Sequence, residues 1–287
     1  MRLLILLLSL PALVAQAATA PEKLENVRGL IRDHQLPAAE SAAKTLIAGD
    51  PADPEVRALL GSVLIAKNDA DGAVDAYEKA AELAPTSGEY QRQLGDAYGF
   101  AVQKAGMFSK MGLAKKCLAA YEKAVELDPA NINARSSVMT FYQQAPSMMG
   151  GGMDKAYAQA AEIKKLDASR GQIAYATLYV GEKKYAEAFA ALEEVLKTTP
   201  DHYLALYQFG RVAALSGQRV DEGMAALKKS LALTPTLGSP AHDAANWRLG
   251  NLWEKKGDKN AARAAYQASL AINPNFPQAI ESLKKLE

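Results

Sequence analysis

The sequence has one cysteine, few aromatic residues and no excess of either charge. Because Cys117 is the only cysteine among 287 residues, no disulfide can form within the chain. Apolar residues make up 49 % but aromatic residues only 7 %, so alanine and leucine dominate, which favours helices over a strand-rich sandwich. The net charge of +1 leaves no basic excess to release counterions from a nucleic acid, and we expect no nucleic-acid partner.

The first 17 residues are predicted to be a signal peptide. A positive start at Arg2 precedes the apolar run from Leu3 to Leu10, and small residues lie at the expected cleavage region. The run is too short to span a bilayer comfortably, and no cysteine nearby could carry a lipid. We expect cleavage after Ala17 or Ala18, which brings the net charge to zero and leaves a periplasmic or secreted protein without a membrane span. The alternative is an uncleaved anchor or an ordinary buried helix.

The chain contains internal repeats. The run Asp-Ala-Tyr-Glu-Lys-Ala-Ala-Glu-Leu-Ala-Pro, which ends at Pro85, matches Ala-Ala-Tyr-Glu-Lys-Ala-Val-Glu-Leu-Asp-Pro, which ends at Pro129. Related endings recur with a basic period of 34 residues and insertions in three units. The seven units end near residues 51, 85, 129, 168, 200, 235 and 274.

Each unit is predicted to be a pair of short helices. In the unit that ends at Pro85, apolar residues recur at helical spacing on both sides of a break at residues 68–72. Small residues are expected where the two helices cross closely, with Gly61 against Ala73 in this unit. Cys117 occupies an equivalent position, so we expect an inert, buried thiol rather than a nucleophile.

The 34-residue period, the closing prolines and the Leu-Gly pairs at Leu60-Gly61, Leu94-Gly95 and Leu249-Gly250 resemble the tetratricopeptide repeat. The resemblance covers residues 21–275 and implies an all-α fold, a right-handed α-solenoid of about seven helix pairs. Residues 276–287 are then a C-terminal capping helix. The first and fifth units depart from the pattern, and no shift in composition divides the array. The fourth unit, with its Gly-Gly-Gly-Met run, resembles a group of exported bacterial repeat proteins.

Three insertions, at residues 101–116, 145–153 and 236–240, distinguish the chain from a regular array. We expect the first two to fall between helices of neighbouring units and to lie together at one edge. They contain the methionines that form a possible insertion surface: Met107, Met111, Met148, Met149 and Met153. These side chains could fill gaps, bind an adaptable partner, or capture Cu(I) through their thioethers. A phosphate site in the glycine run is the weaker reading, because Asp154 is placed to cap the following helix.

No catalytic or cofactor motif is found. His34, His202 and His242 lie far apart and are expected to be surface or capping residues rather than metal ligands. We therefore predict no enzyme activity, no cofactor and no metal site.

The resemblance to tetratricopeptide repeats implies that the first helix of each unit faces a concave, partner-binding groove. The residues expected to face it are Arg92, Asp96, Phe100, Gln143, Tyr207, Arg211, Trp247 and Asn251. Tyr207 and Trp247 could instead brace adjacent helices. The leading hypothesis is a non-enzymatic scaffold or assembly factor of the bacterial cell envelope that binds a protein or peptide. The alternative is an accessory protein that binds a small ligand or Cu(I) through the methionine-bearing insertions.

Overall fold

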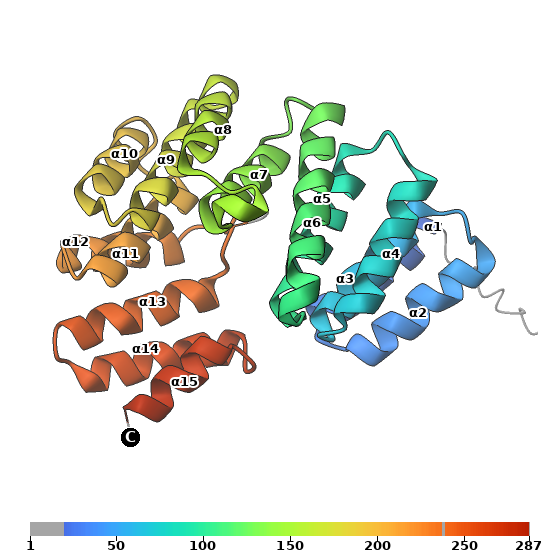
Figure 1. The fold of residues 1–287 in the computed structure, drawn as a ribbon. Helices are drawn as coiled ribbons and strands as arrows, with labels where there is room; N and C mark the ends of the chain where they lie inside the picture. The colour runs from blue at the N-terminus through green and yellow to red at the C-terminus, as the bar shows by residue number, and fades with distance from the viewer. Residues whose placement is uncertain (1–19, 237–238, 287) are drawn as a thin grey trace, which may run out of the picture. The chain divides into compact units, whose positions relative to one another are not determined.

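The computed structural model describes residues 20–236 and 239–286. This part of the chain forms fifteen α-helices and one short 3-10 helix and has no strand, which confirms the expected all-α fold (Figure 1). None of the described helices is long and apolar enough to cross a membrane. The predicted signal peptide at residues 1–17 lies outside the described residues, as does part of the third insertion.

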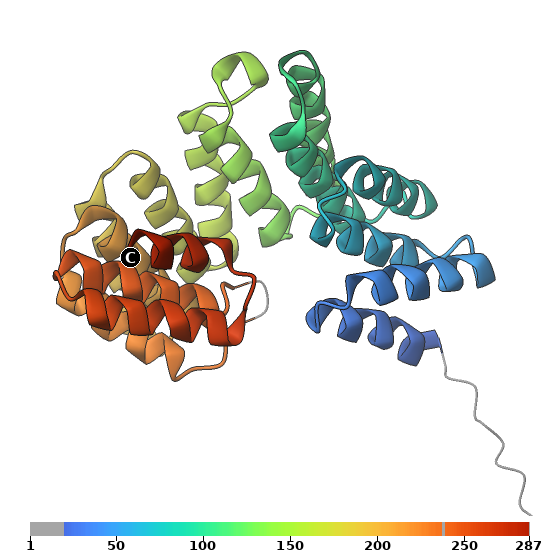
Figure 2. The same ribbon diagram turned by 90° about the horizontal axis from the view of Figure 1, so that it is seen from below.

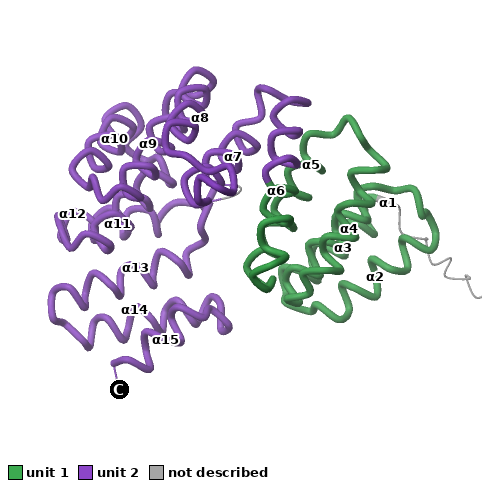
Figure 3. Tube along the Cα trace, viewed as in Figure 1, with its two compact units in different colours: residues 1–117 green, residues 118–287 purple. Residues whose placement is uncertain are grey.

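The chain divides into two compact units, Met1–Cys117 and Leu118–Glu287 (Figure 3). Unit 1 contains α1 to α5 and the beginning of α6. Their bounds are α1 Ala20–Arg32, α2 Leu36–Gly49, α3 Pro54–Ala66, α4 Ala70–Leu83, α5 Gly88–Lys104 and α6 Met107–Leu127. From α1 to α5, each helix packs on the next, and α3 also contacts α1 and α5. The first helices of successive pairs therefore lie side by side.

Unit 2 repeats this arrangement over four pairs and a final helix (Figure 2). The bounds are α7 Ile132–Gln144, the 3-10 helix η1 Ser147–Met149, α8 Met153–Leu166, α9 Ala168–Gly181, α10 Tyr185–Thr198, α11 Tyr203–Ser216, α12 Val220–Leu231, α13 His242–Lys255, α14 Lys259–Ile272 and α15 Pro277–Lys285. Consecutive α-helices pack on one another, and the first helices α7, α9, α11 and α13 also contact in series. A large core cluster lies in this unit and involves residues from α9 to α14.

The ends of the second helices follow the repeat. In six of the seven pairs the second helix ends two residues before the unit end named above, as at Leu83 before Pro85. At five of these six ends the unit closes on a proline, which has no amide hydrogen and disfavours helical backbone in the residue before it; α8 ends before Ala168 instead. Polar residues accept hydrogen bonds from the first backbone amides of several helices; Asp53, for example, caps α3.

The turn within a pair uses a left-handed residue. His34, Asn68, Lys183 and Gly257 each lie two residues before the second helix and have a positive φ. Left-handed backbone crowds the Cβ of an L-residue, and only one of these four positions has the glycine that avoids this cost.

The close helix crossing differs in detail from the expectation. A Cβ on Gly61 would lie 2.6 Å from the Tyr77 ring, so the tight neighbour is Tyr77, four residues beyond Ala73. The same relationship links Gly250 to Tyr266, at 2.3 Å. The large ring fills the space over the glycine, which is why the smaller Ala73 is not the closest neighbour.

The expected position of the first two insertions is wrong. Residues 101–116 form the end of α5, the short turn after it and the beginning of α6, which are the two helices of one pair. The insertion therefore lengthens both helices and does not join neighbouring pairs. Residues 145–153 likewise lie between α7 and α8 of one pair, where they form η1 and a glycine turn. Asp154 is also not the cap of α8, because that helix begins one residue earlier and Gly152 occupies the N-cap position.

Candidate partner-binding site

The predicted groove residues lie on first helices, and they are divided between the two units. Unit 1 carries Arg92, Asp96 and Phe100 on α5. Unit 2 carries the other five, on α7, α11 and α13: Gln143, Tyr207, Arg211, Trp247 and Asn251. Each set is described by itself.

Arg92 is held by carboxylates on its own helix. Its Nη1 donates to Oδ2 of Asp96 at 2.6 Å, while Nε and Nη2 donate to both oxygens of Glu89 at 2.9 and 2.6 Å. The hydrogen bonds to Glu89 raise the pKa of Arg92 despite its partial burial. The spacing of three and four residues places both acids beside the guanidinium, so a ligand would have to displace an existing ion pair to reach it.

Phe100 lies one turn beyond this network and is partly buried. The ammonium group of Lys104 lies 5.5 Å from the centre of its ring, within range of a cation–π interaction. The α5 face of unit 1 therefore combines neutralised charge with an aromatic ring.

Gln143 connects two first helices of unit 2. Its Nε2 donates a hydrogen bond to the backbone oxygen of Thr177 at 3.1 Å, from α7 to α9. A Cβ on Gly181 would lie 2.3 Å from the same nitrogen, so the glycine makes room for the amide. The structure thus gives Gln143 a role in aligning α7 and α9.

Tyr207 and Trp247 both make contacts that brace helices. Tyr207 is only 5 % exposed and belongs to the core of unit 2. Trp247 is partly buried, with its Nε1 donating to Oγ of Ser282 at 3.0 Å and its ring edge-on to Phe276 at 5.9 Å. These contacts hold α13 against the capping helix α15.

Asn251 belongs to a series of hydrogen bonds between α13 and α14, the two helices of the last pair. Its Nδ2 donates to the hydroxyl of Tyr266 at 2.8 Å, and that hydroxyl donates to Oε2 of Glu254 at 2.9 Å. The side chain is therefore engaged inside the pair.

Arg211 lies on α11 and Arg248 lies on α13, two first helices that pack against each other. Among the described residues, no carboxylate oxygen lies within 4.0 Å of either guanidinium, and the one side-chain acceptor of Arg211 is Oε1 of Gln208 at 3.2 Å. Burial and the neighbouring charge of Arg248 lower the pKa of Arg211. The Nε of Arg248 is buried without a hydrogen-bond partner, and its guanidinium stacks over Trp247 at 4.1 Å.

The sequence prediction found Arg211 but missed Arg248. A signal was present, since neither arginine has an acidic residue three or four positions away on its helix. Arg92, by contrast, has Glu89 and Asp96 at those positions. An acidic residue three or four positions away therefore indicates an arginine that is neutralised within its own helix. An arginine without such a neighbour remains available to a partner from elsewhere.

The methionines of the possible insertion surface divide between the units. Met107 and Met111 lie on α6 in unit 1, whereas Met148, Met149 and Met153 lie in unit 2. The described part of the chain holds no group of three or more His, Cys, Asp and Glu residues that could bind a metal. Cys117 is 3 % exposed and donates to the backbone oxygen of Gly95 at 3.2 Å, as expected of a buried thiol. His202 caps α11 through Nδ1.

Comparison with known proteins gives a consistent result. Sequence models described as tetratricopeptide repeat match residues 24–88, 173–238 and 225–280, and a second model with that description matches residues 93–131. No curated protein matches the sequence. Together the matched segments cover well over half of the chain.

Several solved structures share the fold. A tetratricopeptide repeat protein from Parabacteroides merdae is 16 % identical and aligns over 93 % of this chain and 98 % of its own, with a TM-score of 0.59. The thermophilic protein TTC0263 from Thermus thermophilus is 18 % identical over 74 % of this chain and 99 % of its own, with a TM-score of 0.53. Yeast Tom70 is 15 % identical over 96 % of this chain and 58 % of its own, with a TM-score of 0.65.

Helix pairs with a 34-residue period are a binding architecture in which stacked units present an extended surface to protein partners. The chain belongs to the tetratricopeptide repeat family and has the fold of an α-solenoid scaffold for protein–protein interaction.

Proposed function

We propose that the chain is a scaffold or assembly factor of the bacterial cell envelope and that unit 2 binds an acidic segment of a partner protein. The supporting observation is that Arg211 and Arg248 lie on the packed helices α11 and α13 and that, in the described part of the chain, neither has a carboxylate oxygen within 4.0 Å. We name these two residues and the adjacent Trp247 the arginine site.

Electrostatics favour an anionic occupant. Two partly buried guanidinium groups repel each other, and the lowered pKa of Arg211 reflects its burial and the charge of Arg248. A carboxylate placed between them would remove this repulsion and form charge-assisted hydrogen bonds with their guanidinium groups. Arginine and tryptophan are also the residues that most often dominate interface energies.

The same reasoning assigns a smaller part to unit 1. Arg92 already has two carboxylates, so an acidic ligand gains little there. We therefore place the main contact on α11 and α13, and we expect the α5 face to contribute through Phe100.

Binding is tested with a glutamate-rich peptide as the probe and with affinity capture from the envelope fraction. Replacing Arg211 or Arg248 by alanine should weaken peptide binding about tenfold or more, because a charge-assisted hydrogen bond contributes about 1.5–3 kcal/mol. The helical circular dichroism should stay unchanged. Envelope proteins captured by the native chain should be lost with the double variant.

Arg170→Ala is the matched control, since Arg170 is an exposed arginine on the first helix α9 that bonds to Asn133. It should bind the peptide like the native chain. Equal binding by the double variant would exclude the arginine site.

The location is tested separately. Cell fractionation and N-terminal sequencing should find the protein outside the cytoplasmic membrane, beginning at Ala18 or Thr19. A protein that retains Met1 in the cytoplasm would rule out the envelope role without affecting the peptide result.

A further inference from the structure

We propose that the turn between α5 and α6 in unit 1 binds the surface of an anionic phospholipid membrane. We define the lipid tip as residues 104–116, which include the first insertion. This inference does not depend on the arginine site, because it concerns another unit, other residues and another class of ligand.

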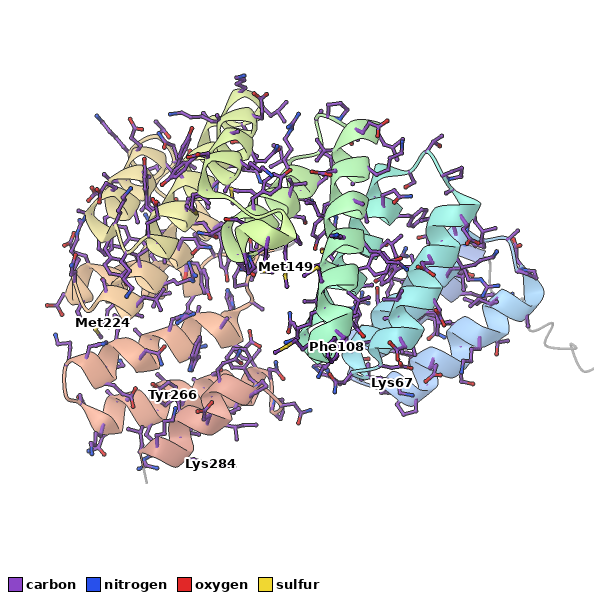
Figure 4. All side chains as sticks on the ribbon, in the orientation of Figure 1. Lys67, Phe108, Met149, Met224, Tyr266 and Lys284 are labelled. Atoms are coloured by element: carbon purple, nitrogen blue, oxygen red, sulfur yellow. The ribbon has the colours of Figure 1, made fainter. Side chains whose placement is uncertain are left out.

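The lipid tip carries large apolar side chains in solvent. Phe108 (Figure 4) is 99 % exposed. Met107 is 85 % exposed and Met111 is 39 % exposed, and all three lie in the first turns of α6. Apolar side chains gathered in this way on the surface of a domain mark an interaction site. Phe108 touches almost nothing in its own chain, so it can enter a lipid layer without displacing a protein neighbour.

Two of these residues share one face of α6 with a lysine. Phe108, Met111 and Lys115 follow a spacing of three and four residues, which places them in one row along the helix. Ala114 and Cys117 lie on the opposite side and are buried. The exposed row is therefore the outward side of the helix.

The lipid tip is basic although the whole chain is nearly neutral. From Ala97 to Tyr121 the sequence has four lysines and no acidic residue. Lys116 forms an ion pair with Glu78 at 3.7 Å. Among the described residues, no carboxylate oxygen lies within 4.0 Å of the other three: Lys104, Lys110 and Lys115.

Apart from Glu78, two acidic side chains lie near the lipid tip, on a different face of α6. Asp69 and Asp71 line an open pocket of about 620 Å³ together with Lys104, Ser109 and Leu113, so Lys104 lies on the pocket side of the tip. Ser109 and Leu113 project from the helix away from the row formed by Phe108, Met111 and Lys115. The outward face consequently combines Lys115, which has no carboxylate within 4.0 Å in the described residues, with apolar side chains.

Such a face fits the boundary between lipid headgroups and acyl chains. Lysine stems can lie along apolar surface while their ammonium groups reach phosphate oxygens, and phenylalanine and methionine enter the acyl region. Anionic headgroups attract each nearby lysine by about 1 kcal/mol. A protein partner with acidic groups would also satisfy the lysines. However, protein hot spots bind in pockets, whereas Phe108 protrudes, and this favours lipid.

The test uses the chain without residues 1–17, which removes the apolar leader and keeps every described residue. Vesicles of phosphatidylcholine alone and of equimolar phosphatidylcholine and phosphatidylglycerol are sedimented with the protein. We expect binding to the anionic vesicles only, weakening as salt is raised. Phe108→Ser should reduce it about tenfold or more, and Lys115→Gln should reduce it about fivefold.

Matched controls lie elsewhere on the surface. Ile272→Ser removes another exposed apolar side chain, at 52 % exposure, and Lys197→Gln removes another lysine that has no acidic partner in the described residues. Both variants should bind like the native chain. In addition, Phe108→Cys can carry an environment-sensitive fluorophore because Cys117 is buried, and its emission should shift to the blue on anionic vesicles.

Three results would overturn the proposal. The first is no dependence on phosphatidylglycerol, and the second is native binding by the Phe108 and Lys115 variants. The third is a blue shift without vesicles. If this shift grows with protein concentration, the lipid tip binds a second copy of the chain. If the shift appears only when polyglutamate is added, the lipid tip binds an acidic protein.

Discussion

The indole Nε1 of Trp247 donates a hydrogen bond to Oγ of Ser282 at 3.0 Å and so ties the first helix of the last pair to the capping helix. The edge-on contact of the same ring with Phe276, just before α15, adds a second link. Since α15 packs on α14 as well, it covers the apolar face that the last pair would otherwise expose.

Loss of this hydrogen bond should loosen the C-terminal cap. We expect Ser282→Ala and Trp247→Phe each to lower the free energy of unfolding by about 1 kcal/mol. Because both substitutions remove the same bond, the double variant should cost less than the sum of the two. Chemical denaturation measures the three differences, and a strictly additive double variant would show that the bond contributes nothing.

The crossing of α13 and α14 should not accept a methyl group. A Cβ on Gly250 would lie 2.3 Å from the ring of Tyr266, which is fully buried and hydrogen-bonded to Asn251 and Glu254. We expect Gly250→Ala to lower the free energy of unfolding by about 1–3 kcal/mol. The control is Gly112→Ala in α6, where a Cβ would have no atom within 4 Å apart from the nearby backbone of its own helix. This substitution should raise the free energy of unfolding by about 0.5–1 kcal/mol. Thermal melts of the two variants should shift in opposite directions.

Much of the repeat could be predicted because it is encoded locally. Closing residues such as Pro85 and the apolar spacing before them act within one helix, and the second helices end close to the predicted positions. The neighbour of Gly61 could not be found in this way, because the choice between Ala73 and Tyr77 depends on how a ring fills the crossing.

The insertions and the arginine site were harder to predict, because they too depend on contacts between helices. No helix-breaking proline lies between Gly88 and Lys104, so α5 could continue into the inserted residues, but the period alone did not show this. The proximity of Arg248 to Arg211 depends on the packing of α13 against α11, which links residues far apart in the chain. Only the lack of an acidic neighbour on each helix was visible in the sequence.

The glycine run of the second insertion contains two glycines with different constraints. A Cβ on Gly151 would lie 1.7 Å from the backbone oxygen of Ala145, whereas the nearest atom to a Cβ on Gly152 is the Cγ of Lys155 at 3.9 Å. We expect Gly151→Ala to cost about 3 kcal/mol or more, since the main chain must move. Gly152→Ala should change the free energy of unfolding by about 0.5 kcal/mol or less. Equal melting temperatures for the two variants would contradict this assignment.

The hydroxyl of Tyr266 should make the stability depend on alkaline pH. Burial, together with the hydrogen bond to Glu254 and the charge of that residue, raises the pKa of Tyr266 to about 12, although the hydrogen bond from Asn251 acts in the opposite direction. The ordinary value is about 10. Between these values the unfolded chain loses the proton while the folded chain keeps it, so the stabilisation is complete below pH 10 and is lost as the pH rises to about 12.

Glu254→Gln separates the two causes. Without the carboxylate, the pKa of Tyr266 should fall but stay above 10, because burial is the largest cause. The loss of stability above pH 10 should then be shallower than in the native chain. Denaturant unfolding across this pH range, together with phenolate absorbance, measures both effects, and an unchanged titration would show that Glu254 does not act on Tyr266.

The left-handed turn residues should respond to glycine according to their side chains. Lys183 has φ +60° and Asn68 has φ +67°, and glycine relieves the crowding of the Cβ at both positions. We expect Lys183→Gly to stabilise by about 0.5–1 kcal/mol and Asn68→Gly by less, because asparagine tolerates this backbone. Arg219, with φ +51°, should behave in the opposite way, since its guanidinium lies 4.9 Å from the ring of Phe189 and 4.8 Å from that of Phe209. Arg219→Gly should therefore destabilise unit 2 even though the same backbone strain is relieved, and a melting temperature that rises would show that strain outweighs these contacts.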